Sequence, residues 1–368
     1  FMIQQYKHMN SSFLVSTNDI KYKSLCVKIN YALNEAFKGF IKTKDENPAL
    51  SFIFTDHLYS FITEKDFYKV KDIRLSEKQV HFKDVELDFL INTNEKYKVY
   101  INVSDQETIK SSVRFFSKAF KNKVEGQIIT FYYRIFLLFT QLWNVEHDAS
   151  YLHASAVNTD GGAVLFSADS GVGKSALLFR LSQEKTCKFI ADDLTIINTS
   201  SKAYYQGRSL SVKPYHLGYF PFLIKKLKKL MGKMQQFQWK IISDSRLIYR
   251  LSPNKLFEKS SEQAKIKRVV HLCSHTKDAF EIKNISKDEL VNSVLPILIN
   301  ELFLANKRLN TLASLPKSFF PSSQVLYSKS RTIFEHAVNN VDIKLVLVPN
   351  NSDPNLLYEF LKQEGCLN

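Results

Sequence analysis

The feature that most constrains the fold of this chain is the stretch FSADSGVGKSALLFRL, residues 166–181. It begins within an apolar run, AVLFSA at 163–168, and the segment after its glycines, 175–184, has the apolar spacing of a helix. An apolar strand, a glycine loop and an amphipathic helix, in this order, form a unit whose backbone amides can hold a phosphate at the helix N-terminus. The sequence therefore predicts a phosphate-binding loop within an α/β arrangement.

The loop matches the pattern G-x-x-x-x-G-K-[ST] at every fixed position except the first, which is Ala168. Gly171 and Gly173 allow backbone conformations in which a Cβ would obstruct a phosphate. Lys174 can reach the β- and γ-phosphates of a nucleotide, and Ser175 can offer its hydroxyl to Mg²⁺. Alanine at the first position costs about 1 kcal/mol if that position needs a positive φ, which a phosphate site tolerates.

The expected nucleotide contacts come from consecutive residues of this loop and of the helix that follows it. They are Ser170, Gly171, Val172, Gly173, Lys174, Ser175 and Ala176. The cofactors that the motif implies are ATP and Mg²⁺. The alternative is a glycine-rich turn between a strand and a helix, with an incidental Lys-Ser pair.

Two adjacent carboxylates follow the next apolar run. Asp192 and Asp193 come directly after Phe189, Ile190 and Ala191. A carboxylate at the end of this strand can hold Mg²⁺ beside the loop serine. Its neighbour can accept the proton of an attacking hydroxyl. A surface turn is the alternative interpretation of the pair.

The rest of the chain indicates a mixed architecture. We expect an N-terminal α+β region over 2–145 and a catalytic domain over 146–368. In the first region four segments are β-rich and two are helical. The β-rich segments are 24–33, 49–56, 78–91 and 96–103, and the helical segments are 107–120 and 131–143. In the second, TDGG at 159–162 predicts a hairpin turn, and 266–275 and 342–349 predict buried strands.

Two C-terminal helical segments are also expected. The stretch 289–309 has the pattern of a helical pair interrupted near Pro296. The stretch 353–365 predicts a terminal helix, with Asp353 as its cap, Pro354 in its first turn and Gly365 after its end.

The chain carries a formal net charge of +15 and four cysteines without metal-ligand spacing. The N-terminus is polar, and the longest apolar stretch, 131–143, contains Arg134 and is too short to span a bilayer. We therefore expect a cytoplasmic protein with free thiols and no membrane span. The positive charge is densest in IKKLKKLMGKMQQFQWK, 224–240, a basic amphipathic helix in which Ile224, Leu227, Leu230, Met231 and Met234 are spaced as a stripe. A surface helix packed on the core, a docking face for an acidic partner and a membrane-surface helix all remain open for it.

The segment LHASAVNTDGGAVLFSADSGVGKSALL, together with FIADDLTII, resembles the HPr kinase/phosphorylase group and its peptide-modifying relatives. It is similar, more distantly, to ATP-dependent phosphoenolpyruvate carboxykinases. The specific resemblance covers about 151–198, and a looser one extends to about 365. It implies an HPr kinase–phosphoenolpyruvate carboxykinase-like P-loop domain in which Asp192 is the general base and Asp193, with Ser175, binds the metal.

The resemblance also implies a role for His153, beside the γ-phosphate or the metal; a packed core histidine is the alternative. The bifunctional HPr enzymes carry a downstream segment resembling E-x-R-G-L-G with a metal-binding glutamate. The nearest stretch here, YYQGRSLSVKP at 204–214, has Gln206 and Arg208 but no glutamate. This departure favours a relative with another substrate. Arg208 and Lys213 are either stabilisers of phosphate charge or ordinary surface cations.

Three functions follow from these features. The first is an ATP- and Mg²⁺-dependent kinase acting on a Ser or Thr hydroxyl of a protein or peptide, such as a biosynthetic precursor peptide, with a small-molecule kinase as its variant. The second is a nucleotide-binding interaction protein that transfers no phosphate. The third, nucleic-acid binding, is motivated by charge alone, since no recognition module is visible. An N-K-x-D base reader and an LSGGQ signature are absent, so GTPases and ABC ATPases fit the sequence poorly. The acceptor, the preference for adenine or guanine, and assembly into a homo-oligomer are left open.

Overall fold

The structure of the chain, a computed structural model, describes residues 2–63, 68–70, 72–82, 87–103, 123–233, 236–237, 239, 248–315 and 318–367. The chain divides into two compact units. Unit 1 consists of Phe1–Asp148 and Ile299–Ser330, and unit 2 of Ala149–Leu298 and Arg331–Asn368. The expected domain boundary near 145 stays a prediction, and unit 1 takes in a later segment that this boundary assigns to the second domain.

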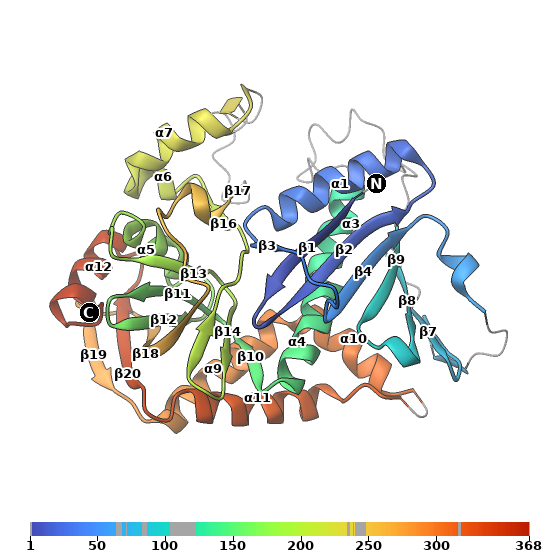
Figure 1. Cartoon of the computed structure of the whole chain (residues 1–368). Coiled ribbons are helices and arrows are strands. Elements are labelled where there is room, and N and C mark those ends of the chain that lie inside the picture. Colours follow the sequence, from blue (N-terminus) through green and yellow to red (C-terminus); the bar gives the residue numbers. More distant parts are fainter. Residues whose placement is uncertain are drawn as a thin grey trace. The chain divides into compact units, whose positions relative to one another are not determined.

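Unit 1 is built on a mixed nine-stranded sheet in the order β3-β1-β2-β4-β9-β8-β7-β6-β5 (Figure 1). Pairing is parallel between β2 and β4 and between β4 and β9, and antiparallel elsewhere. The strands are β1 Ile3–His8, β2 Ser11–Asp19, β3 Lys42–Thr43, β4 Leu50–Thr55, β5 Tyr68–Val70, β6 Ile73–Leu75, β7 Gln79–Phe82, β8 Asp88–Asn92 and β9 Lys98–Asn102. The expected strands near 49–56, 78–91 and 96–103 are confirmed where the structure describes them.

Helices complete unit 1, and one of them corrects an expectation. They are α1 Lys23–Phe37, α3 Lys123–Phe131, the π-helical turn η3 Tyr132–Phe136, α4 Leu137–Glu146 and α10 Phe303–Ala313. The short 3₁₀ turns are η1 Leu58–Phe61 and η2 Thr93–Glu95. The stretch 24–33 is helix and not strand, because Leu25, Ile29 and Leu33 are buried four residues apart. The expected buried helix at 131–143 is confirmed, and the one at 107–120 lies outside the described residues.

The core of unit 1 is a cluster of aromatic rings. The ring centroid of Phe136 lies 5.0 Å from that of Phe13, 5.3 Å from that of Phe37 and 5.5 Å from that of Phe52. These four side chains are fully buried. Because each large ring removes much apolar area from water, the cluster supplies much of the stabilisation of this unit.

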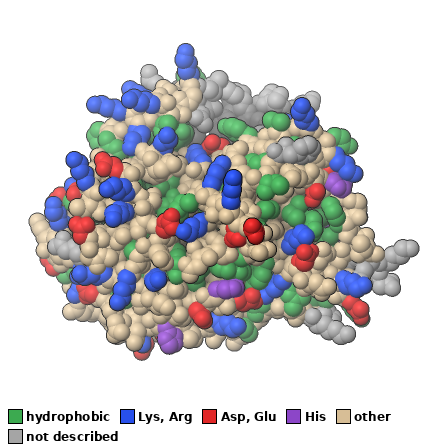
Figure 2. Space-filling view, viewed as in Figure 1, with side chains coloured by type: hydrophobic (Ala, Val, Ile, Leu, Met, Phe, Trp, Pro, Cys, Tyr) green, Lys and Arg blue, Asp and Glu red, His purple; other side chains and the backbone are tan. Residues whose placement is uncertain are grey.

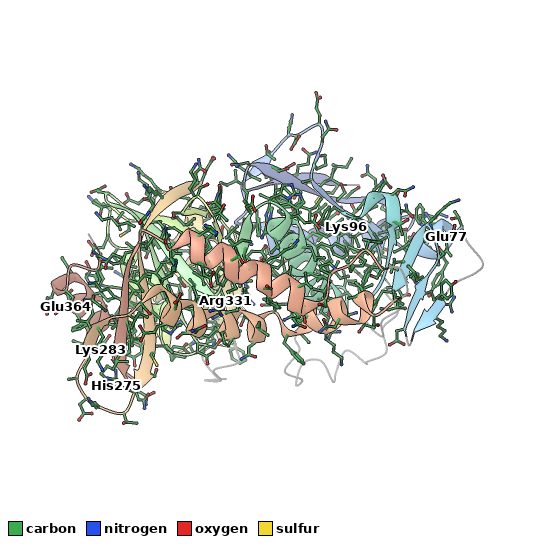
Figure 3. The ribbon with its side chains drawn as sticks, turned by 90° about the horizontal axis from the view of Figure 1, so that it is seen from below. Glu77, Lys96, His275, Lys283, Arg331 and Glu364 are labelled. Atoms are coloured by element: carbon green, nitrogen blue, oxygen red, sulfur yellow. The ribbon has the colours of Figure 1, made fainter. Side chains whose placement is uncertain are left out.

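Unit 2 contains a second nine-stranded sheet, with the path β10-β14-β15-β18-β12-β11-β13 and with β20 and β19 added beside β18. Its centre is parallel, β12 with β18 and β18 with β20. The strands are β10 Ala149–Leu152, β11 Ala154–Thr159, β12 Gly162–Ala168, β13 Lys188–Ala191, β14 Thr195–Asn198, β15 Lys202–Tyr204, β18 Gln263–His275, β19 Glu281–Asn284 and β20 Asp342–Pro349. Figure 3 labels Lys283, which lies on β19, and His275, the last residue of β18.

The remaining elements of unit 2 are a small ribbon and its helices. They are β16 Leu210–Val212, β17 Tyr249–Leu251, η4 Pro253–Lys255, α5 Lys174–Leu181, α6 His216–Tyr219, α7 Pro221–Leu230 and α12 Pro354–Gln363. Helices α9 Lys287–Glu301 and α11 Ser323–Ala337 each run across the division between the units. The terminal helix is confirmed, because the Asp353 side chain accepts from the Asn355 amide and Gly365 has φ +66°.

The interruption expected near Pro296 is wrong. Pro296 lies inside α9, and the helix ends at Glu301. Proline removes one hydrogen bond, that to the carbonyl four residues earlier. Here both Pro296 and Asn292 are exposed, so water can satisfy that carbonyl. The helical pair therefore divides at Leu302, ahead of α10.

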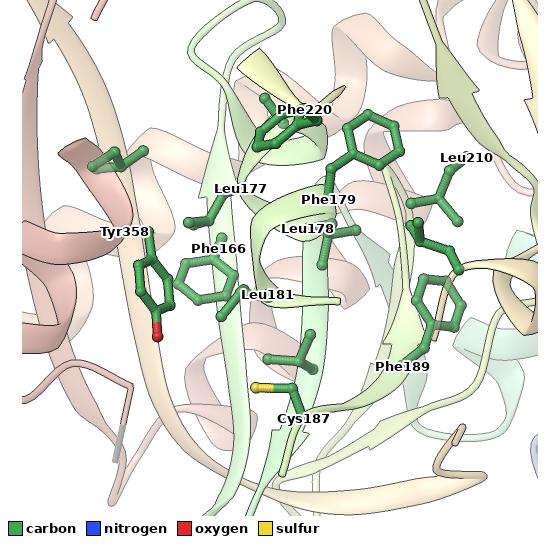
Figure 4. Packing of buried hydrophobic residues seen from close by; sticks show 14 of the residues in the cluster. Phe166, Leu177, Leu178, Phe179, Leu181, Cys187, Phe189, Leu210, Phe220 and Tyr358 are labelled. Carbon is green, nitrogen blue, oxygen red and sulfur yellow. The ribbon is translucent and has the colours of Figure 1, made fainter. Parts of the chain in front are cut away.

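Helix α5 is packed into a cluster of buried apolar side chains. Leu177, Leu178, Phe179 and Leu181 meet side chains from the sheet, from α6 and α7 and from α12 (Figure 4). This packing holds the helix against the sheet at the end of β12.

Two further expectations concern membranes and thiols. Among the described residues, no helix combines the length and the apolar character that crossing a bilayer requires. The cysteines are free, as expected: Cys26, Cys187 and Cys366 are buried, and Cys273 is exposed.

Candidate functional site

The loop at 169–173 connects β12 to α5 and contains two glycines in left-handed conformations. Gly171 has φ +93° and Gly173 has φ +109°. A Cβ built on either glycine meets no atom within 4 Å, so the space next to both is open. A side chain at either position would be strained and would project into this open space.

Ala168, which departs from the motif, is accommodated without strain. It is the last residue of β12, pairs with Leu272 of β18 and is fully buried. It is not among the residues with positive φ. The position therefore needs no glycine in this chain, and the penalty considered for alanine does not arise.

The N-terminus of α5 has no cap from its own N-cap residue. That residue is Gly173, which carries no side chain, and the first turn of the helix holds no acidic residue. The first amides of a helix have no intrahelical partner, and the helix dipole adds a partial positive charge there. This end of α5 therefore suits an anion.

Lys174 is the first residue of α5, and its side chain is 7% exposed. Its Nζ donates to the carbonyl oxygens of Ala168 at 2.8 Å and Asp169 at 2.9 Å. The ammonium group is thus held where β12 ends and the loop begins.

Asp192 follows β13 and is 4% exposed. Its Oδ1 accepts from Ser155 Oγ at 2.8 Å and from Ser175 Oγ at 3.1 Å. Ser155 lies on β11, which pairs with β13, and Ser175 is the second residue of α5. One strand, β11, and the loop helix therefore each bring a hydroxyl to the carboxylate that follows β13.

Asp193 has a different environment from its neighbour. Its side chain is 29% exposed, and its backbone is left-handed with φ +70°. Its Oδ2 pairs with Arg208 Nη1, and its Oδ1 lies 3.7 Å from His153 Nδ1. A left-handed non-glycine residue is strained, although aspartate tolerates this conformation better than most residues do. The left-handed backbone at Asp193 directs the two adjacent carboxylates into different surroundings.

The electrostatics separate the two carboxylates further. Burial, together with the charge of Asp193, raises the pKa of Asp192 above its ordinary value. Burial also acts to raise the pKa of Asp193, but the cations of Arg208 and Lys174 outweigh it and hold that pKa low. Burial and Lys174 lower the pKa of His153 to about 4, so its imidazole is neutral at neutral pH.

The remaining expected residues have these positions. Ser170 and Val172 lie in the loop, and Ala176 is 6% exposed on the packed side of α5. Arg208 lies just before β16 and is 8% exposed. The Lys213 side chain lies over the ring of Tyr215, with 5.9 Å from Nζ to the ring centroid, and not at the carboxylates.

Three contributors were missed from the sequence. Ser155 holds Asp192, and Arg250 of β17 contributes to the low pKa of Asp193. His271 of β18 lies near Lys174, whose charge helps burial to lower the histidine pKa, and its Nδ1 is 3.1 Å from Ser167 Oγ. Only Ser155 carried a signal, since it lies two residues after the histidine that the motif singled out.

Comparisons with known proteins add little. No family model matches the chain, and no curated protein matches it. Among solved structures, the Hpr(Ser) kinase/phosphatase from Coxiella burnetii is similar with 12% sequence identity and a TM-score of 0.26, over 59% of this chain and 93% of that one. A TM-score of this size does not establish a common fold, so the family resemblance of residues 151–198 stays a prediction.

Proposed function

We propose that the chain is a phosphotransferase that uses ATP and Mg²⁺ and delivers the γ-phosphate to a Ser or Thr hydroxyl of a protein or peptide. The observation that carries the proposal is the open glycine loop at a helix end whose N-cap is a glycine, with a buried lysine and two unlike carboxylates beside it. Phosphoryl transfer depends mainly on positioning and charge neutralisation, which these groups can supply.

The loop and Lys174 fit the phosphates of a nucleotide. The space that a Cβ would fill at Gly171 and Gly173 is open, and the N-cap of α5, Gly173, has no side chain that could cap the first turn. An anion there would meet amides, a helix dipole and an ammonium group together. Buried cations are costly unless they meet a negative charge, and phosphates would offset that cost for Lys174.

The oxygen ligands that Mg²⁺ prefers are also present. Ser175 Oγ and the Asp192 carboxylate already touch, so they fit one ion between them. When bound, this ion neutralises part of the phosphate charge. We therefore propose Asp192 and Ser175 as its ligands, which reverses the expected division in which Asp193 binds the metal.

In this division Asp193 orients the acceptor hydroxyl and accepts its proton. Its carboxylate is partly exposed, whereas that of Asp192 is buried, so an incoming hydroxyl can reach it more readily. Arg208 fixes one carboxylate oxygen, and neutral His153 borders the other. We also propose that Arg208 faces the transferred phosphate, because it pairs with the proposed base.

One observation favours a second candidate, a protein that binds the nucleotide without transferring phosphate. Asp193 is paired with Arg208 and its pKa is lowered, so it is a weak base in this arrangement. A catalytic role requires that pairing to loosen or the aspartate to act mainly by orientation.

Calorimetry with Mg·ATP and mass spectrometry of candidate peptides test the proposal. We expect ATP binding by the wild type, a mass gain of one phosphate on the acceptor, and loss of transfer by about 10²–10³-fold in Lys174→Ala. Lys185→Ala, an exposed lysine beyond α5, is the matched control and should behave as wild type. Absence of heat with Mg·ATP would remove both candidates, and binding without transfer would leave the second.

The two aspartates are separated by their magnesium dependence. We expect Asp192→Asn to raise the Mg²⁺ concentration needed for half-maximal transfer, and Asp193→Asn to lower kcat with an unchanged Mg²⁺ requirement. Asp160→Asn, in the exposed hairpin turn at the far end of β12, controls for the amide substitution. The opposite pattern would restore Asp192 as base and Asp193 as metal ligand.

A further inference from the structure

One long segment of unit 2 carries positive charge without any negative charge. From Leu194 to Ser243 the sequence contains no aspartate or glutamate. The same segment contains these cations: Lys202, Arg208, Lys213, Lys225, Lys226, Lys228, Lys229, Lys233 and Lys240. An ordinary surface mixes both signs, so this segment concentrates much of the chain's surplus charge.

Helix α7 is the centre of this segment, and its apolar side is already used. Leu223, Leu227 and Met231, four residues apart, are buried. They belong to the same core cluster as Leu177 and Phe179 of α5. The helix is therefore fixed to the element that begins with Lys174.

The stripe expected in this helix is corrected at two positions. Ile224 is 37% exposed and Leu230 is 39% exposed, so these two members of the stripe do not pack in the core. Leu223 takes that place, and Met234 lies outside the described residues. Two apolar side chains are thus presented to solvent among lysines.

We define the α7 lysine face as the exposed residues Ile224, Lys225, Lys228, Lys229, Leu230 and Lys233. Figure 2 shows the blue side chains gathered over α7 at the upper left. Within the part of the chain that the structure describes, no lysine of this face forms an ion pair, whereas Lys277 and Lys283 of the same unit both pair with Glu281. The charges of the face are available for another molecule.

The chemistry of the face selects its occupant. A membrane-surface helix inserts its apolar side into lipid, but here Leu223, Leu227 and Met231 are buried in the protein core. A nucleic acid needs a long track of phosphate contacts, whereas Lys225 to Lys229 extend over only about 6 Å of helix. Carboxylates interspersed with apolar side chains complement both the lysines and the exposed Ile224 and Leu230.

We propose that the α7 lysine face docks an acidic, partly apolar segment of the protein or peptide that receives the phosphate. This inference rests on the proposed function for the identity of the occupant. Because α7 and α5 share one core cluster, a substrate held on this face keeps a fixed relation to the loop that holds the phosphates.

Fluorescence anisotropy on the full chain tests the docking. The probe is a fluorescein-labelled synthetic peptide of Glu, Leu and one Ser, compared with a twin in which every Glu is Gln. The test variant carries Lys225→Gln, Lys228→Gln, Lys229→Gln and Lys233→Gln. The control variant changes the charge equally at other exposed lysines of unit 2, with Lys202→Gln, Lys259→Gln, Lys265→Gln and Lys267→Gln.

We expect the test variant to bind the acidic peptide roughly tenfold more weakly and the control variant to lose less than about twofold, with the difference shrinking at high salt. Equal losses in both variants, or binding of the Gln twin as tight as that of the acidic peptide, would overturn the docking. So would a face that binds RNA or anionic vesicles but not the peptide.

The two proposals fail separately. Lys174→Ala should lose transfer and keep the acidic peptide bound with wild-type affinity. Peptide binding that depends on the α7 lysine face, in a wild type that transfers no phosphate, would remove the kinase and keep the docking. Transfer that is equally fast in the test variant and the wild type would keep the kinase and remove the docking.

Discussion

Both units contain a nine-stranded sheet, but they differ in the charged groups that they bury. In unit 1 the buried polar groups are mostly neutral and dispersed among aromatic rings, as when His8 Nε2 donates to Asn144 Oδ1 at 2.7 Å. Unit 2 also buries neutral polar groups, but its buried charges, Lys174, Asp192 and Arg208, are gathered near the ends of β12 and β13.

The difference separates stability from function. Burying a charge costs several kcal/mol unless it is paired, and an apolar replacement of a buried ion pair is often neutral or stabilising. Unit 1 demonstrates that this chain can fill a core with rings instead. Its one deeply placed guanidinium among the described residues, Arg308, lies over the ring of Phe82 at 4.6 Å. The gathered charges of unit 2 therefore mark the place where chemistry is expected.

The largest expected effect is on the aromatic core of unit 1. Phe136→Ala should reduce the free energy of unfolding by about 3–5 kcal/mol, because it removes a buried ring and leaves a cavity among its neighbours. Chemical denaturation measures the change. Phe136→Leu keeps most of the volume and should cost less than half as much.

The matched position in unit 2 is Phe179, which is equally buried but meets fewer rings, His216 at 4.9 Å and Phe220 at 5.9 Å. We expect Phe179→Ala to cost less than Phe136→Ala, by about 1 kcal/mol. If Phe179→Ala costs as much or more, the contrast between an aromatic core and a charged site does not describe how the two units are stabilised.

What the sequence could predict depends on how local the signal is. The hairpin turn, β12, the loop and α5 were predictable because each shows its own pattern within a few residues of Gly171. The helix α1 was not, because β-branched and aromatic residues such as Val27 and Tyr31 favour a strand. Both are exposed, at 62% and 63%, so they do not contribute to the core face that decides the structure.

The site was predictable in its residues but not in its contacts. Lys174, Ser175 and the two aspartates follow from a motif, yet the motif does not say which aspartate meets the serine. The pairing of β11 with β13 brings Ser155 to Asp192. The left-handed backbone of Asp193 directs the second carboxylate elsewhere. Pairing between distant strands has no local signature, and this is also why Arg250 was missed.

A smaller effect is expected from acid, through His8. Burial lowers its pKa to about 4 from an ordinary 6.5, although its bond to Asn144 acts in the opposite direction. Between about pH 6.5 and pH 4, His8 is protonated in the unfolded chain but stays neutral in the folded chain. The free energy of unfolding is therefore highest above about pH 6.5 and decreases as the pH falls toward 4. Between pH 7 and pH 5 we expect a loss of about 2 kcal/mol from this residue.

Denaturation of His8→Gln at both pH values isolates the contribution of His8 to the pH dependence of stability, because glutamine can still donate to Asn144 but does not titrate. The variant should lose less stability on acidification than the wild type does. An identical pH dependence in wild type and His8→Gln would show that His8 does not contribute to the loss of stability in acid.

The smallest effect compares two buried serines on neighbouring strands of unit 2. Ser155 donates to the Asp192 carboxylate at 2.8 Å, and Ser167 Oγ lies 3.1 Å from the ring of His271. Both serines are fully buried, so truncation to alanine removes the same atom from similar surroundings. Since a hydrogen bond to a charged group contributes more than one to a neutral group, Ser155→Ala should cost about 1 kcal/mol more than Ser167→Ala at neutral pH.

A double-mutant cycle decides whether that excess comes from charge. In an Asp192→Asn background the partner of Ser155 is neutral, so Ser155→Ala should then cost about as much as Ser167→Ala does in the wild type. The cost of Ser167→Ala should be the same in both backgrounds. An excess that persists with asparagine at position 192 would mean that the pair Ser155–Asp192 is a packing feature like those of unit 1. An excess that disappears would mean that unit 2 maintains a buried negative charge beside Ser175, the condition on which a magnesium site there depends.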